Sequence, residues 1–363
     1  MQRRLVRGVT VGAVAAGAAV FVAEALRPRG GPARLVDWDE IHLLAGRRLG
    51  DAESLGVRRR RALATAYERL AGEVKEPLLE AVGGLPDGVP LPAFQALDRQ
   101  GWLDLNVGIM RRMLAPLEDL PGIPASLVTD WTRGALDRWV AGLFGFLSRR
   151  VLGQFDPQLL GREPVRPGLY LVETNVAAFE RKEKLPAEDL RRWLILHELT
   201  HAWQFAAHPW LAEYMNEEVG HLLSAAGAAG RGLDRLAAVT LGVPAQWEAV
   251  RRLQALMTVV EGYGNLIMNR VGRELLPGFA ELEAAHRRRN AERGPLDLLL
   301  WKLLGLELKL QQYQVGEAFC QAIADAHGMS VLNLVWESPS AMPRSDELRH
   351  PERWHSRVVA ATG

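Results

Sequence analysis

The chain has a single cysteine, Cys320, and this scarcity excludes two kinds of structure. One thiol cannot form a disulfide within the chain, and it cannot provide the several cysteine ligands of a structural zinc site. Cys320 stands in an apolar stretch from Gly316 to Ala322, which favours a buried and inert thiol. We therefore expect any metal ion bound by this chain to be held by histidine and carboxylate side chains.

The chain also lacks an excess of charge of either sign. Its 363 residues include 44 basic and 43 acidic side chains, so no long-range field favours nucleic acid as a partner. The arginine runs Arg58 to Arg61 and Arg287 to Arg289 fall within helical patterns and have no accompanying aromatic or glycine motif. Such runs are typical of solvated helix faces. We expect no nucleic-acid partner.

No hydrophobic run clearly reaches the length of a membrane span. The uncharged run from Val9 to Ala23 has about 15 residues where a span needs roughly 20, and arginines flank it on both sides. A signal peptide, a short uncleaved anchor and a helix packed on the domain all remain open. We interpret residues 1–30 as a signal or anchor segment, with membrane association through residues 9–26. The protein is then membrane-associated or exported, and cytoplasmic otherwise.

Apolar residues at helical spacing dominate the chain beyond residue 35, and short stretches rich in proline and glycine separate the helical segments. The sequence contains no internal repeat and no low-complexity linker. The best strand candidate runs from Leu169 to Val172 and follows a Pro-Gly pair. The sequence thus predicts a mainly α fold with at most a small β element near residues 169–173, in a single domain over residues 35–358.

The strongest chemical signal lies in one predicted helix, from Pro186 to Ala207. Proline and two acidic residues open this segment, as suits a first helical turn. Residues 197–201 read His-Glu-Leu-Thr-His, which is the H-E-x-x-H pattern of zinc peptidases. With nine histidines in the chain, a chance match has a probability of only roughly 1–2%.

The spacing of this motif explains its chemistry. His197 and His201 lie one helical turn apart and differ by about 40° around the axis, so both imidazoles can bind one ion. Glu198 lies beside them rather than in line, which suits a general base that acts on a zinc-bound water. The opposite face of the helix is apolar. We predict a metal site within residues 186–275.

A catalytic zinc usually takes a third protein ligand. The metzincin extension requires glycine at position 204 and histidine at 207, where this chain has Gln204 and Ala207, so that class is excluded. His208 is displaced along the axis and is interpreted as a surface or capping residue. One alternative is an acidic cluster that follows the helix and is more often a solvated face. Its members are Glu213, Glu217, Glu218 and His221.

Glu261 is the favoured third ligand. It is the only charged residue in the apolar helical run over residues 254–268, where a lone carboxylate is costly unless an ion or hydrogen bonds satisfy it. Gly262 and Gly264 permit close approach of another backbone, and Asn265 is a candidate hydrogen-bond partner one turn on. The structural interpretation, a carboxylate paired with an arginine, remains open.

Two histidines, one glutamate and an open position predict Zn²⁺ as the cofactor and hydrolysis of a peptide or small amide as the reaction. The tetrahedral oxyanion needs a further donor, for which Tyr263, Tyr313, His221 and an arginine are all open. The competing hypothesis is a zinc-stabilised binding or scaffold protein, membrane-associated and without turnover. A scarcity of β structure favours that alternative, because zinc peptidases commonly align an extended substrate along a strand edge.

Several blocks of the sequence together resemble an uncharacterised bacterial family of zincin-like hydrolases. The blocks are His197 to Phe205, Gly153 to Pro157, Glu261-Gly262 with Met268, Gln312-Tyr313 with Gly316 to Phe319, and Gly328-Met329 through Val335 to Pro339, with Pro351 and Trp354. The resemblance runs from about Val36 to Val358. It does not include the apolar N-terminal run.

This resemblance implies a helical zincin-like fold and a zinc-dependent metallopeptidase activity. Part of the family is described as associated with biosynthesis of a deazaflavin coenzyme. The chain departs from the family pattern at two positions, where histidine is common in place of Tyr263 and an acidic residue is frequent in place of Asn265. These departures weaken any role of the two residues in catalysis or in supporting the metal ligands.

Overall fold

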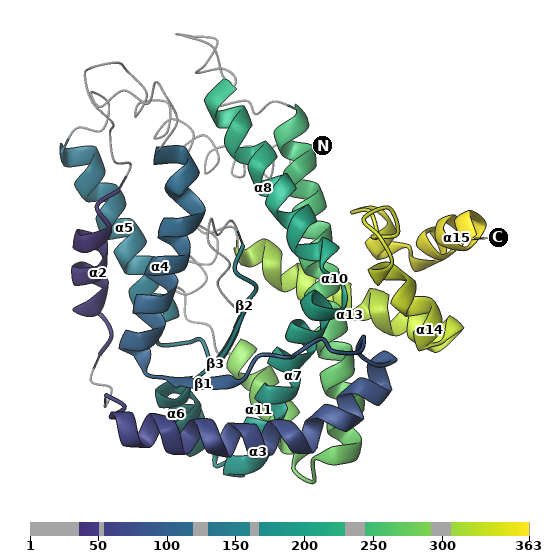
Figure 1. Ribbon diagram of the computed structural model, residues 1–363, viewed down its shortest axis with the longest axis horizontal. Helices are drawn as coiled ribbons and strands as arrows, with labels where there is room; N and C mark the ends of the chain where they lie inside the picture. The colour runs from purple at the N-terminus through teal and green to yellow at the C-terminus, as the bar shows by residue number, and fades with distance from the viewer. Residues whose placement is uncertain are drawn as a thin grey trace. The chain divides into compact units, whose positions relative to one another are not determined.

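Helices make up most of the computed structural model, which confirms the predicted mainly α fold (Figure 1). The structure describes residues 36–50, 54–118, 130–159, 167–228, 244–291 and 306–362. Within these ranges, no helix combines the length and the apolar character that crossing a bilayer requires. The predicted signal or anchor segment, residues 1–30, lies outside them.

Contacts along the chain separate two compact units, which are described one at a time. The first comprises the chain up to Leu49, Leu103–Leu147 and Glu217–Val250, and the second comprises Gly50–Trp102, Ser148–Asn216 and Arg251–Gly363. The sequence predicted one domain over residues 35–358, and that interpretation stays a prediction.

The first unit is helical in its described part. It contains α2 (Trp38–Gly46), most of α4 (Arg99–Glu118), α5 (Asp130–Leu147), most of α8 (Trp210–Ala228) and the first turns of α10 (Pro244–Leu275). Helix α2 packs along α5. The Asp37 carboxylate caps α2 by accepting the N–H groups of Asp39 and Glu40, while its own N–H donates to Asp137 on α5 at 3.1 Å. The start of α2 is thereby tied to its neighbour.

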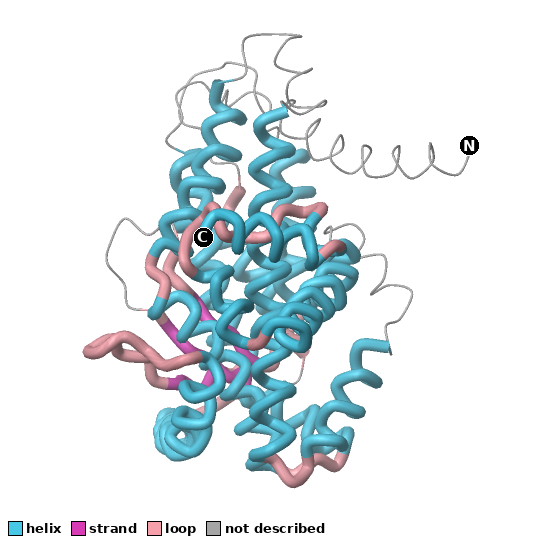
Figure 2. The backbone as a smooth tube through the Cα atoms, turned by 90° about the vertical axis from the view of Figure 1, so that its right-hand side faces the viewer, coloured by secondary structure: helices cyan, strands magenta, loops and turns pink. Residues whose placement is uncertain are grey.

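The second unit contains the β structure of the described chain, a sheet of three short strands in the order β1-β3-β2 (Figure 2). The central strand is the predicted one, β3 (Gly168–Val172). It pairs parallel with β1 (Phe94–Leu97) and antiparallel with β2 (Gly153–Asp156). The sequence missed both outer strands, because each has only four residues and neither contains a β-branched side chain.

Helices α3, α6 and α7 of the second unit pack against this sheet. Helix α3 runs beneath β1 and α7 in Figure 1 and packs against both, and α7 also packs against β2. Cys320 is fully buried, as its apolar surroundings predicted. The elements are α3 (Val57–Val82), α6 (Glu173–Glu183), α7 (Ala187–Ala207), the start of α8, the body of α10, α11 (Phe279–Ala291), α13 (Leu306–His327), α14 (Met329–Leu332), the 3₁₀ turns η1 (Asn333–Trp336) and η2 (Glu347–Arg349), and α15 (Pro351–Thr362).

Helix α7 is fixed at its N-terminal half by a buried ion network. Arg191 on α7 pairs with Glu173 and Glu180 on α6, and the Tyr67 hydroxyl of α3 donates to Glu173 at 2.5 Å. Because Glu173 is almost fully buried, removing its arginine would leave an uncompensated charge in the core. The network therefore holds α3, α6 and α7 in one arrangement.

Candidate metal centre

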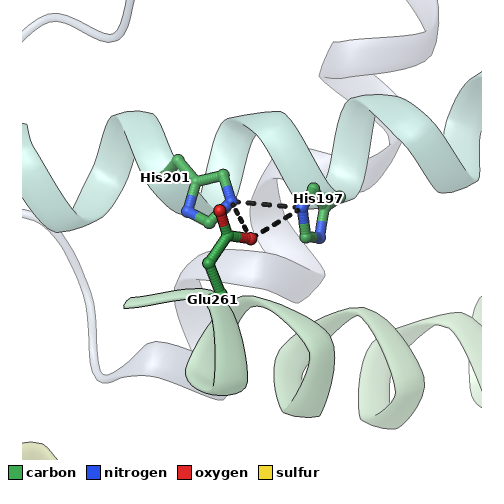
Figure 3. Close-up of side chains that lie close together, drawn as sticks. All are labelled: His197, His201 and Glu261. Carbon is green, nitrogen blue, oxygen red and sulfur yellow. Dashed lines mark hydrogen bonds and ion pairs between the residues drawn. The ribbon is translucent and has the colours of Figure 1, made fainter. Parts of the chain in front are cut away.

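The structure brings the three predicted ligands together. His197 and His201 project from α7, and Glu261 reaches them from α10 (Figure 3). The two Nε2 atoms are 3.1 Å apart, and Oε2 of Glu261 lies 3.8 Å from Nε2 of His197 and 3.5 Å from Nε2 of His201. All three belong to the second unit. Residues 64 positions apart in sequence thus converge on one point.

These separations fit a bound metal ion. Zinc bonds to nitrogen and oxygen of about 2.0–2.1 Å in tetrahedral geometry place neighbouring ligand atoms about 3.3 Å apart. The observed separations of 3.1 to 3.8 Å straddle that value. The donor set, two imidazoles and one carboxylate, is the type that borderline divalent ions such as zinc prefer. The residues therefore fit a metal ion with one position left open.

Two glycines on α10 leave the space that this arrangement of side chains and helices requires. A Cβ atom at Gly264 would lie 3.0 Å from Cε1 of His201 and 3.4 Å from Cε1 of His197, so its absence makes room for both rings. A Cβ atom at Gly262 would instead clash with the backbone of α13 at Gly316. The predicted close approach of another backbone is found at Gly262, whereas Gly264 approaches the two imidazole side chains instead.

Gln204 supports the site in a way that the sequence did not reveal. Its Oε1 lies 2.9 Å from Nδ1 of His201, and its Nε2 donates to the Val260 carbonyl at 3.0 Å. An Nδ1–H donated to Gln204 leaves the Nε2 lone pair of His201 available for a metal ion. The fully buried amide also links α7 to α10 next to Glu261. From the sequence alone, Gln204 indicated only that the chain is not a metzincin.

Asn265, the partner that the sequence proposed for Glu261, does not have that role. It is half-buried, and its side chain forms no hydrogen bond among the described residues. The physical reason is that the buried polar group facing the ligands comes from the neighbouring helix α7. A position one turn along α10 does not reach them.

Replacing Gln204 by leucine should weaken zinc binding by about 10- to 100-fold, the usual cost of losing such a supporting hydrogen bond. Leucine leaves Nδ1–H of His201 and the Val260 carbonyl buried without partners. Affinity is measured by competition with a chromogenic chelator, and folding by circular dichroism. Asn265→Leu is the matched control and should leave affinity unchanged. Equal affinities for both variants would contradict the role of Gln204.

Glu198 lies beside the three ligands, as predicted, and is buried against β2. The backbone N–H of Phe155 donates to its carboxylate, and a Cβ atom at Gly153 would lie 2.5 Å from its Oε1. Burial raises the pKa of Glu198 to about 7, with a smaller upward contribution from Glu261 that the neighbouring His201 opposes. A carboxyl group with a pKa near neutrality can both accept and return a proton.

Strand β2 is an outer strand of the described sheet and lies beside Glu198. The Val172 N–H donates to the Leu152 carbonyl at 2.8 Å, so hydrogen-bonded pairs with β3 recur at every second residue of β2. Gly153 and Phe155 therefore direct their backbone groups away from β3, where the Phe155 N–H meets Glu198. The sequence signal for this strand was the Gly153 to Pro157 block of the family resemblance.

The two imidazoles differ in their affinity for protons. Burial lowers the pKa of His197 to about 3, and the neighbouring His201 adds to this effect. Burial also disfavours the imidazolium of His201, but the hydrogen bond and charge of Glu261 outweigh it and raise the pKa to about 9. The pair therefore holds one proton near neutral pH in the metal-free protein.

Zinc binding should release that proton. Because a ligand imidazole must be neutral, affinity should rise about tenfold per pH unit below pH 9 and level off above it. We expect at least about one proton released per zinc at pH 7.5, from His201. Calorimetry in buffers of different ionisation enthalpy counts the protons. Proton-neutral binding at pH 7.5 would contradict the assignment.

Tyr263 was one candidate donor of a hydrogen bond to the oxyanion, and that prediction is wrong. Its side chain is fully buried, stacks on Trp203 and donates its hydroxyl to Asn333 at 2.7 Å. Burial raises its pKa. Because the hydroxyl is committed to the core, it is unavailable to a substrate.

The remaining candidates are placed as follows. His208 follows the last residue of α7 as the capping residue, as one interpretation had it, but it is half-buried and stacks on Trp336. The side chain of Tyr313 lies outside the described residues. His221 is an exposed residue of the first unit, 3.8 Å from Glu218. Within the described chain, the residues able to hold a metal ion include no member of the acidic cluster Glu213, Glu217, Glu218 and His221.

Comparison with known proteins gives a consistent result. A sequence model of the zincin-like metallopeptidase family matches residues 36–355. The chain is 33% identical to a candidate hydrolase with a novel fold from Chloroflexus aurantiacus, whose solved structure superposes with a TM-score of 0.68. The match covers 89% of this chain and 98% of that one. Among curated proteins nothing matches.

Proposed function

Because the chain belongs to the zincin-like metallopeptidase family, which implies a divalent metal ion, we propose that it is a zinc-dependent hydrolase of peptide or amide bonds. The observation that carries the proposal is the convergence of His197, His201 and Glu261 within 4.8 Å of one another, with the buried Glu198 carboxylate beside them. The similar Chloroflexus protein is itself described as a candidate hydrolase, and this description supports the proposal.

Glu198 is the general base in this proposal. A zinc ion, when bound, supplies a Lewis acid that polarises a carbonyl and lowers the pKa of a water molecule toward 7. The Glu198 carboxylate takes a proton from the attacking water and returns it to the leaving nitrogen, for which its raised pKa is suited. Gln204 keeps the His201 ring oriented while this occurs.

The edge of β2 favours an extended peptide as substrate. The backbone groups of Gly153 and the Phe155 carbonyl point away from β3 beside the proposed base, so a strand-like substrate would add to the sheet there. One outer strand is sufficient to pair with an extended peptide, so the small amount of β structure is compatible with a peptidase. We also retain the proposals of a small amide as alternative substrate and of membrane association through residues 9–26.

Metal removal tests the proposal. The purified protein should contain about one zinc per chain, hydrolyse members of a broad peptide library, lose this activity with 1,10-phenanthroline and regain it with Zn²⁺. Glu261→Gln should lower zinc content well below one per chain, because only two imidazoles then remain. Glu213→Gln, at an exposed position of α8, is the control and should keep full zinc content. Full zinc content in Glu261→Gln would remove Glu261 as a ligand.

A further inference from the structure

A cavity lies in the second unit, and none of the three metal-binding side chains lines it. Its volume is about 410 Å³, and it is open to solvent. Helix α10 contributes Gln254, Ala255 and Thr258 to its wall, and α13 contributes Val315. The rest of the wall comes from residues 345–353, which include η2 and the first turn of α15.

The charged groups around this cavity are mainly cationic. Arg349 and Arg353 line it against a single carboxylate, Asp346, and the His350 imidazole adds a hydrogen-bonding group. Neither guanidinium forms an ion pair within the described chain. Two guanidinium groups that line one cavity and have no ion-pair partner can both donate hydrogen bonds to one anionic group.

Two other nearby carboxylates, Glu347 and Glu352, have partners of their own. Glu347 is buried and binds Arg357 through both oxygens, at 2.7 and 2.8 Å. Glu352 lies 3.5 Å from His350. Asp346 is then the one carboxylate of the described chain that shares the cavity with Arg349 and Arg353, and the cavity keeps an excess of positive charge. The positive end of the α15 dipole, which begins at Pro351, lies at the same place.

The other lining residues suit an organic molecule better than a bare ion. Ala255, Val315 and Leu348 give the cavity an apolar part, and the Gln254 amide adds donors and an acceptor. Gln254 precedes Glu261 by seven residues, which is two turns and about 10 Å along one face of α10. The wall includes none of the three metal-binding side chains, although Thr258 lies one turn of α10 before Glu261.

We propose that this cavity binds a small organic anion, whose carboxylate or phosphate group lies between Arg349 and Arg353 and whose apolar part contacts Ala255 and Leu348. Asp346 disfavours binding of the anionic group, so its removal should strengthen binding. Its side chain does not cap η2, so a substitution there leaves the turn intact. The proposal is independent of hydrolysis at the metal centre.

Calorimetric titration of the full chain with inorganic phosphate and, separately, with succinate tests this site. We expect saturable binding in the millimolar range, which corresponds to about 4 kcal/mol. The variant Arg349→Gln/Arg353→Gln should bind at least about tenfold more weakly, whereas Asp346→Asn should bind several-fold more tightly. The stronger of the two probes identifies the favoured anionic group.

The control removes the same amount of charge elsewhere. Arg58→Gln/Arg61→Gln alters two exposed arginines of α3 and should bind both probes like the wild type. Thermal unfolding of each variant verifies that it folds. Absence of saturable binding by the wild type up to about 20 mM, equal weakening in both double variants, or no gain in Asp346→Asn would each overturn the proposal.

Discussion

Glu198→Gln should lower peptide hydrolysis by about 10²- to 10⁴-fold while zinc content stays at the wild-type level. Glutamine has nearly the same size and keeps an oxygen that can accept the Phe155 N–H, so the contact with β2 is retained. It cannot take a proton from water. Turnover on the best peptide found in the library and zinc per chain are the two measurements.

The same substitution should stabilise the metal-free protein at alkaline pH. Burial raises the pKa of Glu198 from 4.5 to about 7, so the folded state resists its ionisation. This penalty is absent below pH 4.5, grows between pH 4.5 and 7, and then stays constant, at a size on the order of 3 kcal/mol. Urea unfolding at pH 5 and pH 8 should therefore show a larger pH-dependent loss in the wild type than in Glu198→Gln.

Glu188→Gln provides the control on the same helix. Glu188 is exposed in the first turn of α7, where it pairs with Arg69 and Arg192, and exposed pairs contribute less than about 1 kcal/mol. Its loss should change neither turnover nor the pH dependence of stability. If wild type and Glu198→Gln bind zinc equally and both lack activity on the whole library, the chain is better described as a zinc-stabilised binding or scaffold protein.

The candidate site residues that the structure brings together all have local signals in the sequence. His197, Glu198 and His201 follow from helical spacing within one turn. Glu261 follows from the cost of placing a lone carboxylate in an apolar helix, a signal that depends only on its own neighbours in sequence. Each of these inferences needs the period of a helix and no knowledge of which elements pack together.

The features that the sequence missed depend on contacts between distant segments. Gln204 acts through the Val260 carbonyl on another helix, and the hydrogen bond from Phe155 to Glu198 requires β2 to lie against α7. Strands of four residues carry too few side chains to show a period, so their pairing with β3 is decided by packing. Tyr263 has a hydroxyl group close to Glu261 in sequence, which made it a candidate oxyanion donor. Its burial against Trp203, which the sequence does not reveal, excludes that role.

The close crossing of α10 and α13 should be the part of the scaffold most sensitive to a single methyl group. A Cβ atom at Gly316 would clash with the Thr258 carbonyl, and one at Gly262 would clash with the Gly316 carbonyl carbon. In both cases the obstacle is backbone, which cannot rotate away as a flexible side chain can. The helices would have to separate, and the buried contacts around Phe319 and Val259 would be lost with them.

Gly316→Ala should therefore lower the free energy of unfolding by about 3 kcal/mol or more, at the upper end of the cost of overpacking. Gly72→Ala is the matched control: it lies inside α3 with open space around the new methyl group, so it should stabilise the protein by about 0.5–1 kcal/mol. Urea unfolding measures both changes. Since Gly262 adjoins Glu261, Gly262→Ala should also weaken zinc binding. Wild-type stability of Gly316→Ala would show that α10 and α13 do not cross this closely.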